Sequence, residues 1–325
     1  MGTLFVDRKD SHLALEGNVL ALRLPDQPVQ RIPVNLIARV FIRSNTELTS
    51  GTLTGLAERG IAITLLGGRR GDRVATLVGS SAADVRARIT QIQRLSDESF
   101  NRAWCSSVLT AKLRSQKRLL KTAQAARPDQ RKPLHDAIHT LADCLARLRE
   151  DLDVPTLRGL EGAAAAAHFR GLSCLFAPSL QFTARRRRPP ADPVNACLSL
   201  GYTLLYAQAI EACHAQGLDP AVGYLHRPAH GRASMACDLM EPSRAHVDAF
   251  VWELFRSGEL EAAHFGRDGS DACLLGKTGR SRFYARWARQ ARPLNRHLRR
   301  LARLATRSLG TLDSSLAIDD FWEAT

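Results

Sequence analysis

The sequence predicts an α+β fold, in which a small N-terminal β-rich domain over residues 1–80 precedes a larger all-α domain over residues 81–325. Two observations predict this division. Short runs that alternate apolar and polar residues fill the first part of the chain, which is typical of half-buried strands. From Ala82 onward, apolar residues instead recur three or four positions apart, as they do in helices. A chain of 325 residues is also long enough to build two hydrophobic cores.

The N-terminal domain is expected to consist mainly of strands. They are predicted at residues 3–6, 12–15, 19–24, 31–34, 39–42, 61–66 and 74–78. A hairpin turn is expected at 16–18, and a short helix over 48–59 is expected to end at Gly60. The glycine-rich cluster at 67–72 lacks the residue order of a phosphate-binding loop, so we interpret it as a hairpin loop.

The domain boundary is placed near Ser80-Ser81, where the composition changes. Helical spacing of apolar residues begins with Val85, Ile89, Ile92 and Leu95 and continues through 102–126 and 134–151. Prolines at positions 128, 133 and 155 are expected at the joins between helices.

The chain is strongly basic, with a formal net charge of +14, and only six of its 46 basic residues are lysine. GC-rich coding can explain the preference for arginine, but it does not explain the excess of cations. We therefore expect a polyanionic partner, and nucleic acid is favoured over a membrane surface. Two segments are candidates for phosphate contact: the loop Arg185–Arg188 and the run Arg280–Arg307, which is interleaved with aromatic residues. Each of them is also compatible with a solvated surface that binds nothing.

The seven cysteines are scattered and form no C-x-x-C pair, which argues against a disulfide framework or a zinc ribbon. They favour a reducing compartment. The N-terminus has no apolar signal segment, and no run of 18 apolar residues occurs in the chain. We therefore expect a cytoplasmic protein with no membrane partner.

A lone carboxylate lies among small residues in the segment RGLEGAAAAAHF, residues 158–169. Glycine is a poor helix former and alanine the best, so we expect an abrupt break at Gly159 and Gly162 with a helix after it. Small neighbours leave the Glu161 carboxylate uncovered, which suits contact with a metal or a substrate. Taken alone, the segment is more typical of a packed alanine-rich helix with a solvated glutamate at its start.

Two later segments add an imidazole and two carboxylates. His226 ends GYLH in a turn rich in glycine and proline, and Asp238 and Glu241 are three residues apart in DLMEPSR, residues 238–244. On a helix, this spacing puts both carboxylates on one face. A packed histidine and a capping carboxylate are the simpler alternatives. Together with Glu161, the set of oxygen donors and one imidazole suits Mg²⁺ or Mn²⁺ better than zinc. Such an ion activates phosphodiesters.

Four segments occur in the order typical of the CRISPR-associated adaptation integrase family, and the chain resembles that family through them. They are RGLEGAAAAAHF, DPVNACLSLGYTLLY at 192–206, GYLH and DLMEPSR. The resemblance implies a homodimer formed through the β-rich domain, with catalysis and DNA binding in the helical domain. It also implies that a small ferredoxin-like CRISPR adaptation subunit bridges pairs of dimers.

The resemblance further implies an activity and a set of site residues. The activity is insertion of short DNA duplexes as spacers at a CRISPR repeat, by attack of a 3′-hydroxyl on a phosphodiester, with an associated endonuclease activity. The implied metal ligands are Glu161, His226 and Glu241, and Asp238 supports the site or contacts DNA. The family's Asn and Tyr fall on Asn195 and Tyr202. We interpret Asn195 as near-site support and Tyr202 as a packing residue. A helix capped at its N-terminus by Asp192 or Asn195 is the simpler alternative.

The chain departs from the family pattern at His168, where the family often has tyrosine. We expect a surface histidine there, or alternatively a pH-sensitive neighbour of the site two helical turns from Glu161. Two other functions remain open from the sequence. One is a general metal-dependent nuclease acting on branched or single-stranded DNA, and the other is a DNA-binding scaffold with an idle site.

Overall fold

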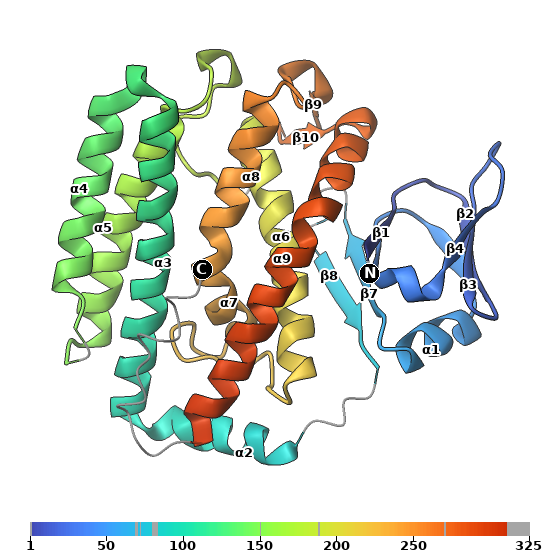
Figure 1. The fold of residues 1–325 in the computed structure, drawn as a ribbon, viewed down its shortest axis with the longest axis horizontal. Helices are drawn as coiled ribbons and strands as arrows, with labels where there is room; N and C mark the ends of the chain where they lie inside the picture. The colour runs from blue at the N-terminus through green and yellow to red at the C-terminus, as the bar shows by residue number, and fades with distance from the viewer. Residues whose placement is uncertain are drawn as a thin grey trace.

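The computed structural model describes residues 2–68, 71, 73–79, 84–149, 151–187, 189–269 and 271–310. Strands dominate the first part of the chain and helices the rest, so the predicted α+β fold is confirmed (Figure 1). The predicted boundary at Ser80-Ser81 lies outside the described residues, as do Arg69, Arg70 and Asp72 of the glycine-rich cluster. No helix among the described residues is long and apolar enough to cross a membrane.

The N-terminal part contains two four-stranded sheets. In the first, the strand order is β1 (Gly2–Val6), β5 (Ile37–Ile42), β7 (Ala62–Gly67) and β8 (Arg73–Leu77), with only the last pair antiparallel. In the second, the order is β4 (Gln30–Pro33), β3 (Val19–Arg23), β2 (Ser11–Glu16) and β6 (Thr46–Leu48). All seven predicted strands are present, and the three-residue β6 was missed.

The short helix α1 (Ser50–Glu58) follows the signals in its sequence. Thr49 caps it by accepting a hydrogen bond from the Thr52 backbone N–H. Gly60 ends the helical segment with φ +69°, a conformation that glycine adopts at little cost. The predicted helix and its end at Gly60 are therefore confirmed.

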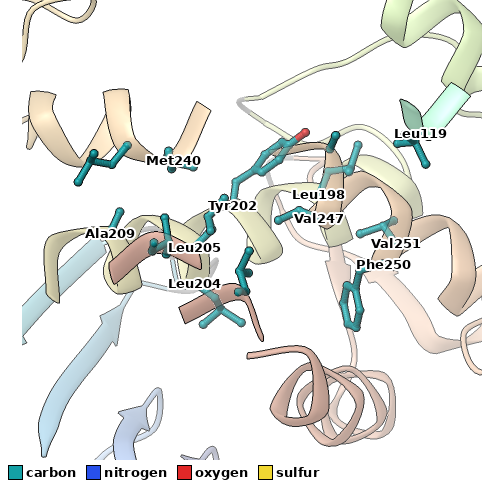
Figure 2. Close-up of a cluster of buried hydrophobic side chains, with 14 of the residues drawn as sticks. Leu119, Leu198, Tyr202, Leu204, Leu205, Ala209, Met240, Val247, Phe250 and Val251 are labelled. Carbon is teal, nitrogen blue, oxygen red and sulfur yellow. The ribbon is translucent and has the colours of Figure 1, made fainter. Parts of the chain in front are cut away.

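The helical part has a layer of three long helices and a largely buried helix, α6 (Pro193–Ala215), that packs against several others. The layer consists of α3 (Glu98–Ala126), α4 (Arg131–Arg147) and α5 (Val154–Ser173), which pack side by side (Figure 1). The other α-helices in the described part of this region are α2 (Val85–Gln93), α7 (Ser234–Met240), α8 (Arg244–Arg256) and α9 (Lys277–Gly310). Helix α6 packs against α7, α8 and α9. Figure 2 shows Tyr202, Leu204 and Leu205 of this helix in one apolar cluster. The cluster also contains Met240 of α7 and Val247, Phe250 and Val251 of α8.

Two details of the helical part differ from the sequence analysis. The first is a short antiparallel pair of strands, β9 (Phe265–Arg267) and β10 (Cys273–Leu275), so the all-α description was wrong there. The second is that α5 begins at Val154, where Asp153 accepts a hydrogen bond from the Thr156 N–H. The cap and tertiary packing outweigh the low helix propensity of glycine, so the break predicted at Gly159 and Gly162 was wrong and both lie inside α5.

A buried ion pair and an aromatic stack join the β-rich part to the helices. Arg39 of β5, only 2% exposed, forms a two-pronged ion pair with Glu211 of α6, at 2.9 and 3.2 Å. The Phe5 ring stacks on Tyr284 of α9 with ring centroids 4.4 Å apart. Moving β5 away from α6 would leave Arg39 or Glu211 as a buried unpaired charge. The ion pair therefore holds the β-rich part against the helices.

Candidate active site

Three segments bring two carboxylates and a lysine together at the centre of the helical part. Glu161 lies on α5, Lys112 lies on α3, and Glu241 begins the 3₁₀ turn Glu241–Ser243 that follows α7. Lys112 Nζ donates a hydrogen bond to Glu161 Oε1 at 2.6 Å and lies 2.7 Å from Glu241 Oε2. The lysine and Glu241 are almost completely buried, whereas Glu161 is partly exposed. The site therefore opens towards solvent on the Glu161 side.

The carboxylate of Asp238 holds His226 and the turn that carries it. Its Oδ1 lies 2.7 Å from His226 Nδ1 and accepts the His226 backbone N–H at 2.9 Å. Its Oδ2 accepts the backbone N–H groups of Tyr224 and Leu225 at 2.8 and 3.0 Å and the Trp104 indole at 3.1 Å. His226 Nε2 is thereby directed towards Glu241 Oε1, 3.9 Å away.

Gly223 allows this turn to lie close to the start of α7. A Cβ atom at Gly223 would lie 2.5 Å from the carbonyl carbon of Ser234 and 2.8 Å from the His226 oxygen. Both neighbours are backbone atoms that have little freedom to move. The glycine in GYLH is therefore a packing requirement of the loop that positions His226.

The charges in the site stabilise one another. Burial alone would raise the pKa of Glu241, but the cations Arg244 and Lys112, with His226, outweigh it and lower the pKa to about 2. Burial would likewise lower the pKa of Lys112, yet Glu241 and Glu161 outweigh burial and raise it. Lys112 is therefore an ammonium and Glu241 a carboxylate over the physiological pH range.

A buried polar cluster lies behind the site. His168 is fully buried, with Nε2 2.8 Å from Asp248 Oδ2, and the Tyr202 hydroxyl donates to the other Asp248 oxygen. The expectation of a surface histidine at 168 was wrong, because Asp248 of α8 provides a buried partner that sequence spacing does not reveal. Tyr202 packs in the core as predicted (Figure 2). The guanidinium of Arg244 lies over its ring, 4.5 Å from the ring centroid. Arg244 in turn lies 3.3 Å from Glu241 Oε1.

Asn195 supports the basic loop that precedes α6. Its side-chain oxygen accepts hydrogen bonds from Arg185 Nη1 and the Arg186 backbone N–H, at 2.8 and 2.9 Å. Asp192 is the cap of α6, as one of the two sequence alternatives predicted. Arg185 is held over the Tyr202 ring rather than being solvated, whereas Arg188 lies outside the described residues.

Arginines line a cavity of about 720 Å³ next to this cluster. Its walls come from β8 of the first sheet, the described part of the loop before α6, the helices α6 and α7, strand β10 and the start of α9. Seven arginines contribute to it: Arg43, Arg73, Arg185, Arg187, Arg232, Arg244 and Arg280. Arginine guanidinium groups bind phosphate oxygens in pairs, so the cavity suits a polyanion. Arg244 belongs both to the cavity and to the surroundings of Glu241.

The basic run Arg280–Arg307 lies on α9, as its spacing predicted. Its aromatic residues Phe283, Tyr284 and Trp287 are buried and belong to the core. Several of its arginines pair with acidic residues, namely Arg280 with Asp7, Arg286 with Glu259 and Arg299 with Glu211. Others line a second basic cavity of about 970 Å³ between α9 and the β-rich part.

Lys112 was not predicted as a site residue from the sequence. It lies in the apolar stripe of α3, between Leu109 and Leu113 and on the same buried side as Gln116. A lysine within an apolar helical stripe is rarely buried without a charged partner, and this was the signal that the sequence offered. The cavity arginines Arg43, which directly follows β5, and Arg73 of β8 carry no comparable signal, because their neighbours are set by the tertiary fold.

The proposed ligands do not form a closed metal site in this arrangement. Across the part of the chain that the structure describes, no three His, Cys, Asp or Glu side chains are close enough to hold a metal ion together. The reason is that the Lys112 ammonium lies between the carboxylates of Glu161 and Glu241. The donors nevertheless suit a hard divalent cation, since a cation already sits between them and Glu241 Oε2 has no hydrogen-bond donor of good geometry.

Comparison with known proteins gives a consistent result. The family model described as CRISPR associated protein Cas1 matches residues 4–289. The CRISPR-associated endonuclease Cas1 1 of Thermodesulfovibrio yellowstonii is 33% identical over 299 residues, which cover 90% of this chain and 93% of that protein.

Two solved structures share the fold. A casposase bound to an integration product has a TM-score of 0.82 at 22% identity, covering 98% of this chain and 94% of that one. A chain of a Cas6-RT-Cas1–Cas2 complex has a TM-score of 0.79 at 22% identity, covering 96% of this chain and 35% of that one.

Proposed function

The chain belongs to the CRISPR-associated Cas1 family, and on that premise we propose that it is a metal-dependent DNA integrase with an associated endonuclease activity. It would insert short DNA fragments as spacers into a CRISPR array. The observation that carries the proposal is the convergence of Glu161, His226 and Glu241 beside an arginine-lined cavity. Carboxylates and an imidazole next to a basic surface suit a protein that holds DNA by its phosphates and reacts with one of them.

The metal would be held by one oxygen of Glu161, one oxygen of Glu241 and the Nε2 atom of His226. The donor set suits Mg²⁺ or Mn²⁺, which supply polarisation of the phosphoryl oxygen and stabilisation of the charge that develops on it. Asp238 would keep the proton of His226 on Nδ1, which leaves the Nε2 lone pair for the ion. We therefore assign Asp238 a positioning role.

The reaction follows from these parts as an exchange of one phosphodiester for another. The 3′-hydroxyl oxygen of the fragment bonds to phosphorus at the edge of the repeat, and the bond from phosphorus to the 3′-oxygen of the array strand breaks. The departing oxygen takes up a proton, so no water is consumed. Arginines of the cavity would hold the phosphates in register for the attack. The same fold in a casposase bound to an integration product supports this chemistry.

The proposal includes the assembly in which the protein works. Residues 1–80 would form the dimerisation domain of a homodimer, and residues 81–325 would carry catalysis and DNA binding. A small ferredoxin-like CRISPR adaptation subunit would bridge pairs of dimers in the cytoplasm. A Cas6-RT-Cas1–Cas2 complex contains a chain of this fold, which supports a second adaptation subunit as partner.

A strand-transfer assay tests the proposal. It combines the purified protein, the small adaptation subunit encoded beside it, a labelled short duplex, a plasmid that carries the repeat, and Mn²⁺. Labelled plasmid that forms with the wild type and is lost with Glu161→Gln supports the integrase. Cleavage without joining would instead favour the general nuclease, and DNA binding without any chemistry would favour the scaffold.

A further inference from the structure

The Lys112 ammonium occupies the space between the two carboxylates that the proposed function gives to a metal. It is within 2.7 Å of an oxygen of each, and its side chain is 8% exposed. A divalent ion bound to the same two oxygens would lie about 2.1 Å from each of them. The ammonium and the ion therefore require the same volume.

Without any metal, the carboxylates of Glu161 and Glu241 already have cationic partners. Glu161 and Glu241 contribute two negative charges, and Lys112 and Arg244 contribute two positive charges. A divalent ion added to this arrangement would lie against the ammonium in a poorly solvated pocket, where repulsion between like charges is strong. Lysine has a long, flexible chain and a single charged head, so its ammonium can leave a site that a rigid arginine fork would hold.

On the basis of the proposed function, we propose that Lys112 is the resident counter-cation of the metal-free site and competes with the divalent metal for Glu161 and Glu241. Metal loading then requires the ammonium to move away. A DNA phosphate at the site offers the displaced ammonium a new anionic partner, so DNA and metal bind cooperatively. Lys112 thereby couples metal occupancy to the presence of substrate.

A purely structural role for Lys112 predicts the opposite effect on metal binding. If the lysine only holds the two carboxylates together, its removal lets them spread apart, and the metal binds more weakly. If it competes with the metal, its removal makes the pocket more negative and frees the volume, and the metal binds more tightly. The sign of the change in affinity separates the two roles.

The test is Mn²⁺ binding by calorimetry to the full chain after treatment with EDTA, comparing wild type, Lys112→Gln and Lys112→Met. The matched control is Lys121→Gln, an exposed lysine on the same helix. We expect Mn²⁺ to bind the Lys112 variants about tenfold more tightly or better, because the competing charge is gone. The control should bind like the wild type. Equal or weaker binding by both variants would overturn the inference.

Failure of the proposed function gives a different result. If neither the wild type nor Lys112→Gln shows saturable binding of Mn²⁺ that Glu161→Gln abolishes, the metal site itself is wrong. Wild-type binding that depends on Glu161, without tightening in the Lys112 variants, overturns only the role of Lys112. If Lys112→Gln folds only with metal, it is prepared with Mn²⁺ and mixed with EDTA. Slower release of Mn²⁺ than from the wild type supports competition, and equal or faster release overturns it.

Cooperativity with DNA is measured in the same way. Mn²⁺ affinity is determined with and without a short duplex that ends in 3′-deoxynucleotides, which cannot react. We expect the duplex to strengthen Mn²⁺ binding more in the wild type than in Lys112→Gln, because only the wild type has an ammonium to transfer. Equal strengthening in both would refute that transfer.

Discussion

His226 Nδ1 lies 2.7 Å from Asp238 Oδ1, and the same carboxylate accepts the backbone N–H of His226 itself. Both oxygens of Asp238 accept N–H groups, an arrangement that stabilises the imidazole proton on Nδ1. In that tautomer the Nε2 atom carries a lone pair and no proton, and it lies 3.9 Å from Glu241 Oε1, where a cation could bind both atoms. One buried carboxylate thus fixes the position of the loop, the orientation of the ring and its tautomer.

Substitution of Asp238 by Asn should weaken metal binding while leaving every proposed ligand in place. The amide nitrogen would face N–H donors from Trp104 or the 224–226 backbone. We expect Mn²⁺ affinity to fall by about 10- to 100-fold. The unsatisfied donors should also cost about 1–3 kcal/mol of unfolding free energy. Calorimetry with Mn²⁺ and urea unfolding measure the two effects, and an unchanged Mn²⁺ affinity would contradict the positioning role.

Glu161→Gln and His226→Ala should each abolish strand transfer and leave DNA binding nearly unchanged. The affinity for DNA rests mainly on arginine–phosphate contacts, which neither substitution removes. Strand transfer and fluorescence anisotropy with a labelled duplex measure the two properties separately. Glu253→Gln, on the outer part of α8 and paired with Arg256, serves as a control for the loss of one carboxylate. Strand transfer that persists in either site variant would refute the ligand assignment.

Arg187→Ala should weaken DNA binding without affecting folding. Arg187 is exposed and lines the arginine-rich cavity. If it contacts one phosphate, the slope of log affinity against log salt should become shallower by about 0.7–0.9. Arg147→Ala, at the exposed end of α4, should leave the slope unchanged. An identical slope in wild type and Arg187→Ala would exclude a phosphate contact at this position.

Protonation of His297 on α9 should lower the free energy of unfolding in mild acid relative to neutral pH. Burial, followed by His246 and Arg300, lowers the pKa of His297 from 6.5 to about 4. The unfolded chain therefore binds more protons between pH 6.5 and 4, and stability falls as the pH falls through that range. Between pH 6.5 and 4, we expect the His297→Gln protein to lose about 1–2 kcal/mol less unfolding free energy than the wild type. This figure allows for partial exposure of the ring.

Urea unfolding at pH 7, 5.5 and 4 measures this dependence. The exposed His135→Gln on α4 is the control and should follow the wild type. A His297→Gln protein whose stability falls with pH as steeply as that of the wild type would show that other groups cause the acid sensitivity.

Local patterns in the sequence predicted the secondary structure well, because alternation and caps act over a few residues. The seven strands and the turn at Gly60 follow from such local signals. The start of α5 was predicted wrongly, since propensity at Gly159 and Gly162 was weighed without the Asp153 cap. Strand β6, with only three residues, has too short a pattern to be recognised.

The candidate site was predictable only in part. Glu161, His226 and Glu241 were identified through the family segments, and the structure brings Glu241 near both of the others. The role of Lys112 and the partnership of His168 with Asp248 depend on which helices pack together. Contacts between residues so far apart in the sequence leave no periodic trace in it.

The interior position of Gly159 and Gly162 in α5 gives the helix a bare surface around Glu161. No atom beyond the helix's own neighbourhood lies within 4 Å of where either Cβ would be, so packing does not require glycine at these positions. Each glycine makes the helix about 1 kcal/mol less stable than alanine would. At these two exposed positions of α5 the backbone is not covered by a side chain. A sugar–phosphate chain that lies across them would contact peptide groups directly.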